Sequence, residues 1–145
     1  MRLSLIIVLF LFTLNNLFAE VESIGKIKSL KGTVSIIRNG SSITAKLGTK
    51  LQVKDEIVTS RNSDCSILFK DNTMISLDEN TTYIIVAYNY NPKKSNYELK
   101  GEVKTGKILF NSGKIPKIAS NNVNIKTPSA IIGVKGTKFV MEVNK

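Results

Sequence analysis

Residues 64–77 read Asp-Cys-Ser-Ile-Leu-Phe-Lys-Asp-Asn-Thr-Met-Ile-Ser-Leu, and this stretch decides the fold class. Apolar side chains alternate with polar ones on both sides of the central Asp-Asn pair, with Ile67 and Phe69 in phase before it and Ile75 and Leu77 in phase after it. A period of two is typical of a strand with one buried face. Asp and Asn also tolerate the left-handed backbone of a tight turn. The stretch therefore predicts two antiparallel strands joined at that pair.

The same alternation recurs along most of the chain. Val34 and Ile36 share a face just before Asn39-Gly40, a dipeptide that tolerates positive φ at both positions of a hairpin turn. Turn signals of this kind recur about every 8–12 residues, and no segment after residue 19 has the sustained spacing of an apolar helix face. Strands are expected at residues 32–38, 42–45, 64–70, 73–77, 82–90, 97–103, 107–110, 123–126 and 130–140.

These patterns predict an all-β protein, a single compact domain of short, mostly antiparallel strands. A jelly roll or sandwich and a β-solenoid-like roll both fit the spacing. Cys65 is in phase with Ile67 and Phe69, so we expect a small buried hydrophobe there, with an intermolecular disulfide as the alternative. The expected core consists of the in-phase apolar residues Val34, Ile36, Leu51, Val53, Ile57, Ile67, Phe69, Ile75, Leu77, Ile125 and Phe139.

The N-terminal segment has the order of a secretory signal peptide. Arg2 gives a positive start, an apolar run of about a dozen residues follows, and Ala19 is a small residue before the expected cut. The run is shorter than the roughly 20 residues that a spanning helix needs. We expect a signal peptide at 1–19, one domain at 20–145, and no membrane span after cleavage. A retained anchor is the alternative, because Leu17 is larger than the residue usual at its position.

The composition excludes several classes of function. The chain has 145 residues, with 21 Lys+Arg, 11 Asp+Glu, no His, one Cys and a net charge of +10. His is the commonest general base and metal ligand, and a lone Cys builds neither an internal disulfide nor a thiolate cluster. The pairs Asp55-Glu56 and Asp78-Glu79 are neighbours that would point to opposite faces of a strand, so we expect turn and edge residues there. We expect no enzyme, no cofactor and no metal site.

Three blocks of the sequence resemble the FecR domain, the periplasmic domain of bacterial iron-uptake sigma-factor regulators. The first joins residues 32–34 (Gly-Thr-Val) to 51–59 (Leu-Gln-Val-Lys-Asp-Glu-Ile-Val-Thr). The second is the hairpin at residues 64–77, which resembles the family's "Asp-Gly-Ser/Thr, x, Ile, x, Leu" hairpin. The third and most specific is residues 125–139, Ile-Lys-Thr-Pro-Ser-Ala-Ile-Ile-Gly-Val-Lys-Gly-Thr-Lys-Phe, which resembles "Thr-Pro … Val-Arg-Gly-Thr, x, Phe".

The resemblance implies an exported β module that makes protein contacts. Lys54 and Asn72 stand where the family usually has Gly, and Lys135 replaces an Arg, which keeps the charge and loses the planar fork of donors. The alternative for the third block is a turn that holds the last strand in register, with Lys135 paired to an acid. The residues implied as partner contacts or family signature are Thr127, Pro128, Gly133, Val134, Lys135, Gly136, Thr137 and Phe139.

The regulators of this family carry a cytoplasmic sigma-binding segment before the domain, where this chain has an apolar leader, so the sigma-factor role is not expected to transfer. We expect a non-catalytic binding module of the bacterial cell envelope, exported and periplasmic, with a link to signalling as one option. The expected partner is an envelope protein, with lipopolysaccharide or another anionic glycan second, and no nucleic acid. The alternative is an envelope structural or assembly protein that self-associates or binds anionic glycan or peptidoglycan.

Two surface features each allow two interpretations. Lysines are spread along the chain, and they indicate either a Lys-rich composition or attraction to anionic envelope material. Asn80-Thr81-Thr82 is an Asn-x-Thr acceptor that follows two acids, so Asn80 is a candidate glycosylation site, with a polar turn as the alternative.

Overall fold

The computed structural model describes residues 20–136 and 138–144. The predicted signal peptide at 1–19 and the signature residue Thr137 lie outside the described residues. The strands are β1 (Gly25–Lys31), β2 (Val34–Arg38), β3 (Ser41–Thr44), β4 (Lys50–Leu51), β5 (Glu56–Thr59), β6 (Asp64–Phe69), β7 (Met74–Leu77), β8 (Thr82–Asn91), β9 (Asn96–Asn111), β10 (Val123–Lys126), β11 (Ile131–Gly133) and β12 (Lys138–Val143). The helical turns are η2 (Pro92–Lys94), α2 (Lys114–Ile118) and η3 (Ser120–Asn122).

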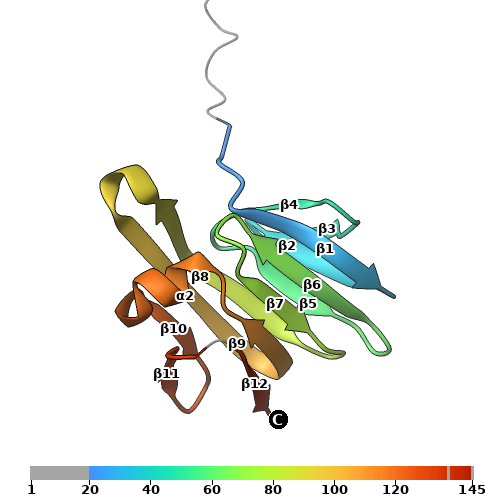
Figure 1. Ribbon diagram of the computed structural model, residues 1–145. Coiled ribbons are helices and arrows are strands. Elements are labelled where there is room, and N and C mark those ends of the chain that lie inside the picture. The colour runs from blue at the N-terminus through green and yellow to red at the C-terminus, as the bar shows by residue number, and fades with distance from the viewer. Residues whose placement is uncertain (1–19, 137, 145) are drawn as a thin grey trace, which may run out of the picture.

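The strands form one continuous sheet in the order β3-β2-β5-β8-β9-β7-β6-β1-β4. Beside this path, β10 pairs with β9 and β11, and β12 pairs with β9 (Figure 1). Every ladder is antiparallel except that between β9 and β10. The prediction of an all-β domain of short, mostly antiparallel strands is confirmed.

The long strand β9, of 16 residues, belongs to both halves of the curled sheet. Its first part pairs with β8 and β10, and its last part pairs with β7 and β12. Gly106 lies between the two parts with φ +93°, and an added Cβ there would collide with Thr81. The sequence pattern predicts two separate strands here, at 97–103 and 107–110. The structure joins them through this glycine, and the halves close over a common core.

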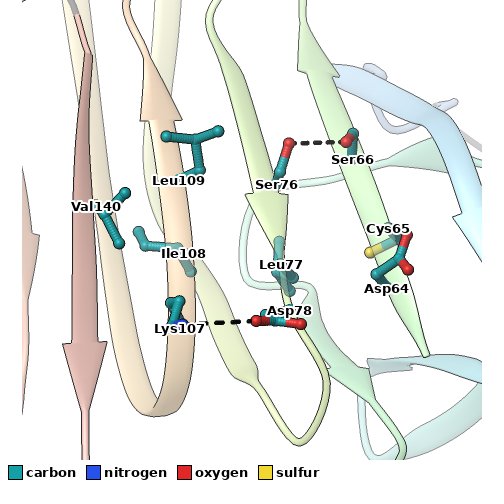
Figure 2. Close-up of a pocket in the computed structure, with 10 residues that line it drawn as sticks. All are labelled: Asp64, Cys65, Ser66, Ser76, Leu77, Asp78, Lys107, Ile108, Leu109 and Val140. Carbon is teal, nitrogen blue, oxygen red and sulfur yellow. Dashed lines mark hydrogen bonds and ion pairs between the residues drawn. The ribbon is translucent and has the colours of Figure 1, made fainter. Parts of the chain in front are cut away.

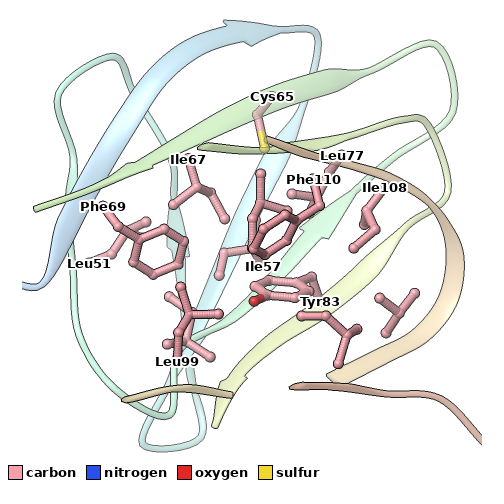
Figure 3. Close-up of a cluster of buried hydrophobic side chains, with 14 of the residues drawn as sticks. Leu51, Ile57, Cys65, Ile67, Phe69, Leu77, Tyr83, Leu99, Ile108 and Phe110 are labelled. Atoms are coloured by element: carbon pink, nitrogen blue, oxygen red, sulfur yellow. The ribbon is translucent and has the colours of Figure 1, made fainter. Parts of the chain in front are cut away.

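The core lies between the two halves of the sheet, where buried apolar side chains from both meet (Figure 3). Nine of the eleven residues predicted for the core are buried. Phe139 is half-buried against the cluster, and Val53 was wrongly assigned, since its side chain is 36% exposed. Val53 lies in the turn between β4 and β5, where the two-residue alternation no longer applies.

Tyr83 is the largest fully buried side chain and sits across the centre of this core (Figure 3). Its ring covers Gly101 on the neighbouring strand so closely that a Cβ at that position would overlap the ring. An aromatic ring placed over a cross-strand glycine fills the space that a side chain would take. Burial raises the pKa of the Tyr83 hydroxyl, which has no hydrogen-bond partner among the described residues.

Several elements differ from the expected strand pattern, and β4 and β5 lie outside every range that was expected to be a strand. The first strand, β1, was not predicted, because a register irregularity between Ile27 and Ser29 interrupts its alternation. The single helical turn α2 is too short to show an apolar period. The segment expected as one strand at 130–140 is two strands, β11 and β12, which lie in different halves of the sheet.

Candidate functional site

The turn between β6 and β7 is organised by Asp71, a carboxylate that is 0% exposed. The hydroxyl of Thr73 donates to Oδ2 at 2.6 Å, the hydroxyl of Tyr88 donates to Oδ1 at 3.0 Å, and the amide of Ile115 donates to Oδ2 at 3.0 Å. A buried anion is stable only when such donors replace its water. The position after it, Asn72, has φ +67°, as expected for the turn. Asp71 thus ties the turn to both β8 and α2.

The hydroxyl of Tyr88 is part of this arrangement and is not a candidate acid or base. Burial, followed by the negative charge of Asp71, raises the pKa of Tyr88 well above its usual range. The ring of Tyr88 also stacks on Phe69, with 5.1 Å between ring centroids. The Asp-Asn-Thr motif therefore has a structural role, in which it anchors three elements.

A second buried carboxylate, Asp55, forms a bidentate ion pair with Arg38. Nε of Arg38 donates to Oδ1 at 2.8 Å and Nη2 donates to Oδ2 at 2.8 Å. The hydrogen bonds with Asp55 raise the pKa of Arg38, and the amide of Gln52 also donates to Oδ2 at 2.8 Å. Lys54 has φ +73°, which explains why glycine is usual at this point of the motif. Asp55 lies in a turn, as predicted, yet it is fully buried.

The other acids of the two adjacent pairs do not share a cleft with Asp55. Glu56 lies 3.5 Å from the ammonium group of Lys104, and Glu79 accepts a hydrogen bond from the amide of Asn62 at 2.7 Å. Asp78 lies 3.9 Å from Lys107. The neighbouring Asn80 is exposed, with φ +51°, in the turn between β7 and β8. This placement leaves the candidate glycosylation site accessible.

The signature residues of the third block divide into buried and exposed sets. Thr127 closes the β10–β11 turn, where its amide donates to the carbonyl of Ala130 at 2.8 Å and its Oγ1 accepts from the amide of Ala130 at 3.1 Å. Val134 is buried, and its amide donates to the carbonyl of Val123 at 3.2 Å. Phe139 stacks on Phe110 with 4.9 Å between ring centroids. These three residues hold β10, β11 and β12 in place.

The remaining described signature residues face solvent. Pro128, Gly133, Lys135 and Gly136 are exposed, and an added Cβ on Gly136 would meet nothing within 4 Å. Lys135 makes no ion pair with any residue that the structure describes, in contrast to the alternative of a lysine paired to an acid. These positions are open to a partner.

An apolar strip, which we define as residues 128–132, projects between the buried Thr127 and Val134. Ile131 is 70% exposed and Ile132 is 40% exposed. The strip contains the start of β11, which pairs only with β10 in the described part of the chain, so its outer edge has unused main-chain groups. The apolar residues are visible in the signature, but their exposure depends on β11 being the outermost strand, which the sequence does not show.

A shallow trough of about 310 Å³ lies on the outer face of β6, β7, β9 and β12 (Figure 2). The hydroxyls of Ser66 and Ser76 are 2.8 Å apart across two strands, and Leu109 and Val140 supply apolar surface. The trough was missed by sequence reasoning, which followed the inward-facing phase of each strand. Its hydroxyl and apolar groups are suited to a contact surface.

Cys65 borders this trough from the core side (Figure 2). The residue is buried, as predicted from its phase. Burial raises the pKa of the Cys65 thiol to about 12, so the reactive thiolate is scarce at neutral pH.

Neither a metal cluster nor a membrane helix is found in residues 20–136 and 138–144. No three Cys, Asp or Glu side chains gather there in a way that could hold a metal ion. No helix in the same part of the chain combines the length and the apolar character that crossing a membrane requires.

Comparison with known proteins gives one match. A family model described as "FecR protein" matches residues 55–145, well over half of the chain. The match includes the buried Asp55, the Asp71 turn and the whole third block. No curated protein and no solved structure matches the chain.

Proposed function

The chain belongs to the FecR family, and from this premise we propose that it is a non-catalytic binding module exported to the bacterial cell envelope. The family is a signalling-related, envelope-associated group of regulators. The domain would contribute to such a system by contacting a protein partner, in the periplasm, after cleavage of residues 1–19. Intact mass of the exported protein tests the cleavage, and retention of Met1 would contradict it.

One observation carries the proposal, namely the exposed apolar strip at residues 128–132. Its flanking residues Thr127 and Val134 are buried, so the fold anchors the strip at both ends while Ile131 is 70% exposed. A contiguous exposed apolar patch on a folded domain is a common mark of an interaction site. The free edge of β11 can also accept the main chain of an extended partner segment, as in recognition by strand addition.

The charge around the strip indicates the kind of partner. Residues 103–141 contain seven lysines and no Asp or Glu. Lys126 and Lys135, on either side of the strip, are exposed and have no ion pair among the described residues. Lys126 does have the acidic Glu102 opposite it in the β9–β10 register. The excess of positive charge favours a partner with an acidic surface.

The same charge supports the second candidate, an anionic glycan such as lipopolysaccharide or peptidoglycan. Binding of an anionic glycan would depend on the positive charge of Lys126 and Lys135 and would not depend on the apolar side chains of Ile131 and Ile132. The two therefore separate experimentally, because neutralising Lys126 and Lys135 would weaken either form of binding, whereas changing the isoleucines would weaken only the protein contact.

The test compares envelope extracts of cells that produce the wild-type chain, an Ile131→Asp/Ile132→Asp variant, or a Leu47→Asp control. Leu47 is a matched control because it is 69% exposed and lies between β3 and β4, away from the strip. We expect the wild type and the control to migrate in a complex that contains an envelope protein on native gels, and the double variant to lose that protein from its band. Equal migration of all three would contradict the protein-contact function. Sedimentation with purified lipopolysaccharide or peptidoglycan tests the glycan candidate.

A further inference from the structure

The last strand, β12, leaves a second edge of the sheet open. Its six residues pair on one side with β9, from Lys138 opposite Asn111 to Val143 opposite Gly106. In the described part of the chain no strand pairs with its other side. A regular edge of this length offers unused N–H and C=O groups, and proteins normally protect such edges against pairing. This edge is separate from the apolar strip, so a role for it is independent of the proposed function.

The two charged residues of β12 have opposite signs and lie at equal distances from its exposed centre, Val140. Lys138, Val140 and Glu142 are exposed and alternate with the more buried Phe139 and Met141, as expected for one outer and one inner face. Val140 is 63% exposed, and it has a positive residue, Lys138, two positions before it and a negative residue, Glu142, two positions after it. A strand of this pattern is complementary to its own reverse.

Antiparallel pairing of two β12 strands about Val140 uses this symmetry. Lys138 of each copy then stands directly opposite Glu142 of the other, at the separation where cross-strand ion pairs are favourable. Centring the pair on Lys138 or on Glu142 instead would place like charges opposite each other, and parallel in-register pairing would do the same. Only the Val140-centred register matches both charges, and it has the twofold symmetry usual for dimers.

The apolar side chains of β12 favour the same arrangement. The two Val140 side chains would meet on the outer face and lose their exposure. On the inner face, Phe139 is half-buried on Phe110 and would stand opposite Met141 of the second copy. Pairing would thus cover apolar surface on both faces of the edge.

We propose that β12 is a self-pairing edge, through which two copies of this chain form an antiparallel ladder centred on Val140. The outer faces of the two copies, with their troughs, then join into one continuous surface. The dimer places two apolar strips on one particle, which would let it engage two partner molecules.

Charge reversal with complementation tests the proposal on the full exported protein. In the proposed dimer residue 138 of each copy faces residue 142 of the other, so there are two cross-strand pairs. Either Lys138→Glu or Glu142→Lys alone turns both pairs into pairs of like charge. We expect sedimentation velocity to show a concentration-dependent dimer for the wild type and at least a tenfold weaker one for each variant. Mixing the two variants restores both opposite-charge pairs, so a mixed dimer of wild-type affinity should form, which also shows that both variants are folded. Lys46→Glu, at an exposed lysine between β3 and β4, is the matched control and should not weaken the dimer.

A second measurement tests the register. Since the native Cys65 is buried, Val140→Cys supplies the reactive thiol, and two opposing residues of an antiparallel pair lie within disulfide distance. We expect Val140→Cys to give a dimer band that disappears with reductant, and Lys138→Cys to give far less. A monomeric wild type up to its solubility limit, unchanged dimers in the single charge variants, or no mixed dimer would each overturn the proposal. A dimer lost on changing Ile131 and not Lys138 would also overturn it.

Discussion

The hydroxyl of Tyr88 on β8 donates a hydrogen bond of 3.0 Å to Oδ1 of Asp71, at the turn between β6 and β7. Because these elements belong to different halves of the sheet, this contact closes one end of the core. Asp71 is fully buried, and its other carboxylate oxygen accepts bonds from Thr73 and from the amide of Ile115. The motif thus links two halves and the helical turn that precedes the third block.

Replacing Asp71 with Asn should destabilise the domain by about 2–3 kcal/mol, the cost of leaving buried donors without an acceptor. The new side chain keeps one oxygen and replaces the other with an NH₂ group. A donor that hydrogen-bonds to the replaced carboxylate oxygen would then face an N–H group and lose its acceptor. Urea unfolding followed by circular dichroism measures the change. Asp64→Asn, at an exposed carboxylate of β6, serves as the control and should stay within about 0.5 kcal/mol of the wild type. Equal stability of both variants would refute the anchoring role.

The Arg38–Asp55 pair gives a second prediction. Arg38→Met removes both 2.8 Å hydrogen bonds and leaves a buried carboxylate without its cation, which should cost about 3 kcal/mol. Arg38→Lys should recover only part of this loss, because an ammonium group cannot form the bidentate contact. A double-mutant cycle with Asp55→Asn measures the coupling directly. Additive effects in that cycle would show that the pair contributes nothing.

Cys65 should be unreactive in the folded protein. At pH 8, alkylation by iodoacetamide should be slow until denaturant is added, because burial raises the thiol pKa from 9.0 to about 12. No reductant-sensitive dimer of the wild type should appear on a gel. Rapid labelling of the native protein, or such a dimer, would restore the intermolecular disulfide as the better interpretation.

The same pKa shift predicts how stability depends on pH. Below pH 9 the thiol is protonated in both states, and from pH 9 to about 12 only the unfolded chain releases the proton. The contribution of the thiol is therefore complete below pH 9 and is lost as the pH rises, by up to about 1.4 kcal/mol per unit. The free energy of unfolding of Cys65→Ala, measured over the same pH range, is subtracted from that of the wild type. The subtraction removes the contribution of lysines and tyrosines that titrate in this range. A difference that does not fall with pH would contradict the assigned shift.

Two glycines should respond differently to an added side chain, one with a loss of stability and the other with almost none. Gly101→Ala places a methyl group into the ring of Tyr83 and should cost about 2–3 kcal/mol, as overpacking does. Gly136→Val should leave the melting temperature nearly unchanged, because its Cβ meets open space. The signature motif by itself suggests the reverse order, since a turn that fixes the last strand would be sensitive at Gly136. Thermal unfolding of the two variants decides between these views.

The hairpins could be predicted from the sequence because their chemistry is local. Asn39 and Gly40 have φ of +50° and +78°, and β2 pairs with β3 across them as the dipeptide indicated. Asp71 and Asn72 form the other predicted turn. The alternation of apolar and polar residues also predicted most of the buried core, because this two-residue period can be recognised from neighbouring residues alone.

The features that were missed depend on contacts between distant residues. Nothing around Asp71 shows that its carboxylate will accept bonds from Tyr88 and Ile115, because these partners are 17 and 44 positions away. The exposure of Ile131 and Val140 follows from β11 and β12 being outermost strands, and strand order is not visible in local alternation. The third block therefore reads as a uniform signature, although the fold divides it into buried anchors and exposed residues.

The most direct test of the binding function is photo-crosslinking in living cells, with a benzophenone amino acid placed at Ile131 or, as the matched exposed control, at Leu47. We predict that the Ile131 probe captures one envelope protein, that Ile132→Asp abolishes this adduct, and that the Leu47 probe does not form it. An Ile131 probe that captures no more than the Leu47 probe, or an adduct that persists with Ile132→Asp, would contradict the claim that this strip is the contact surface.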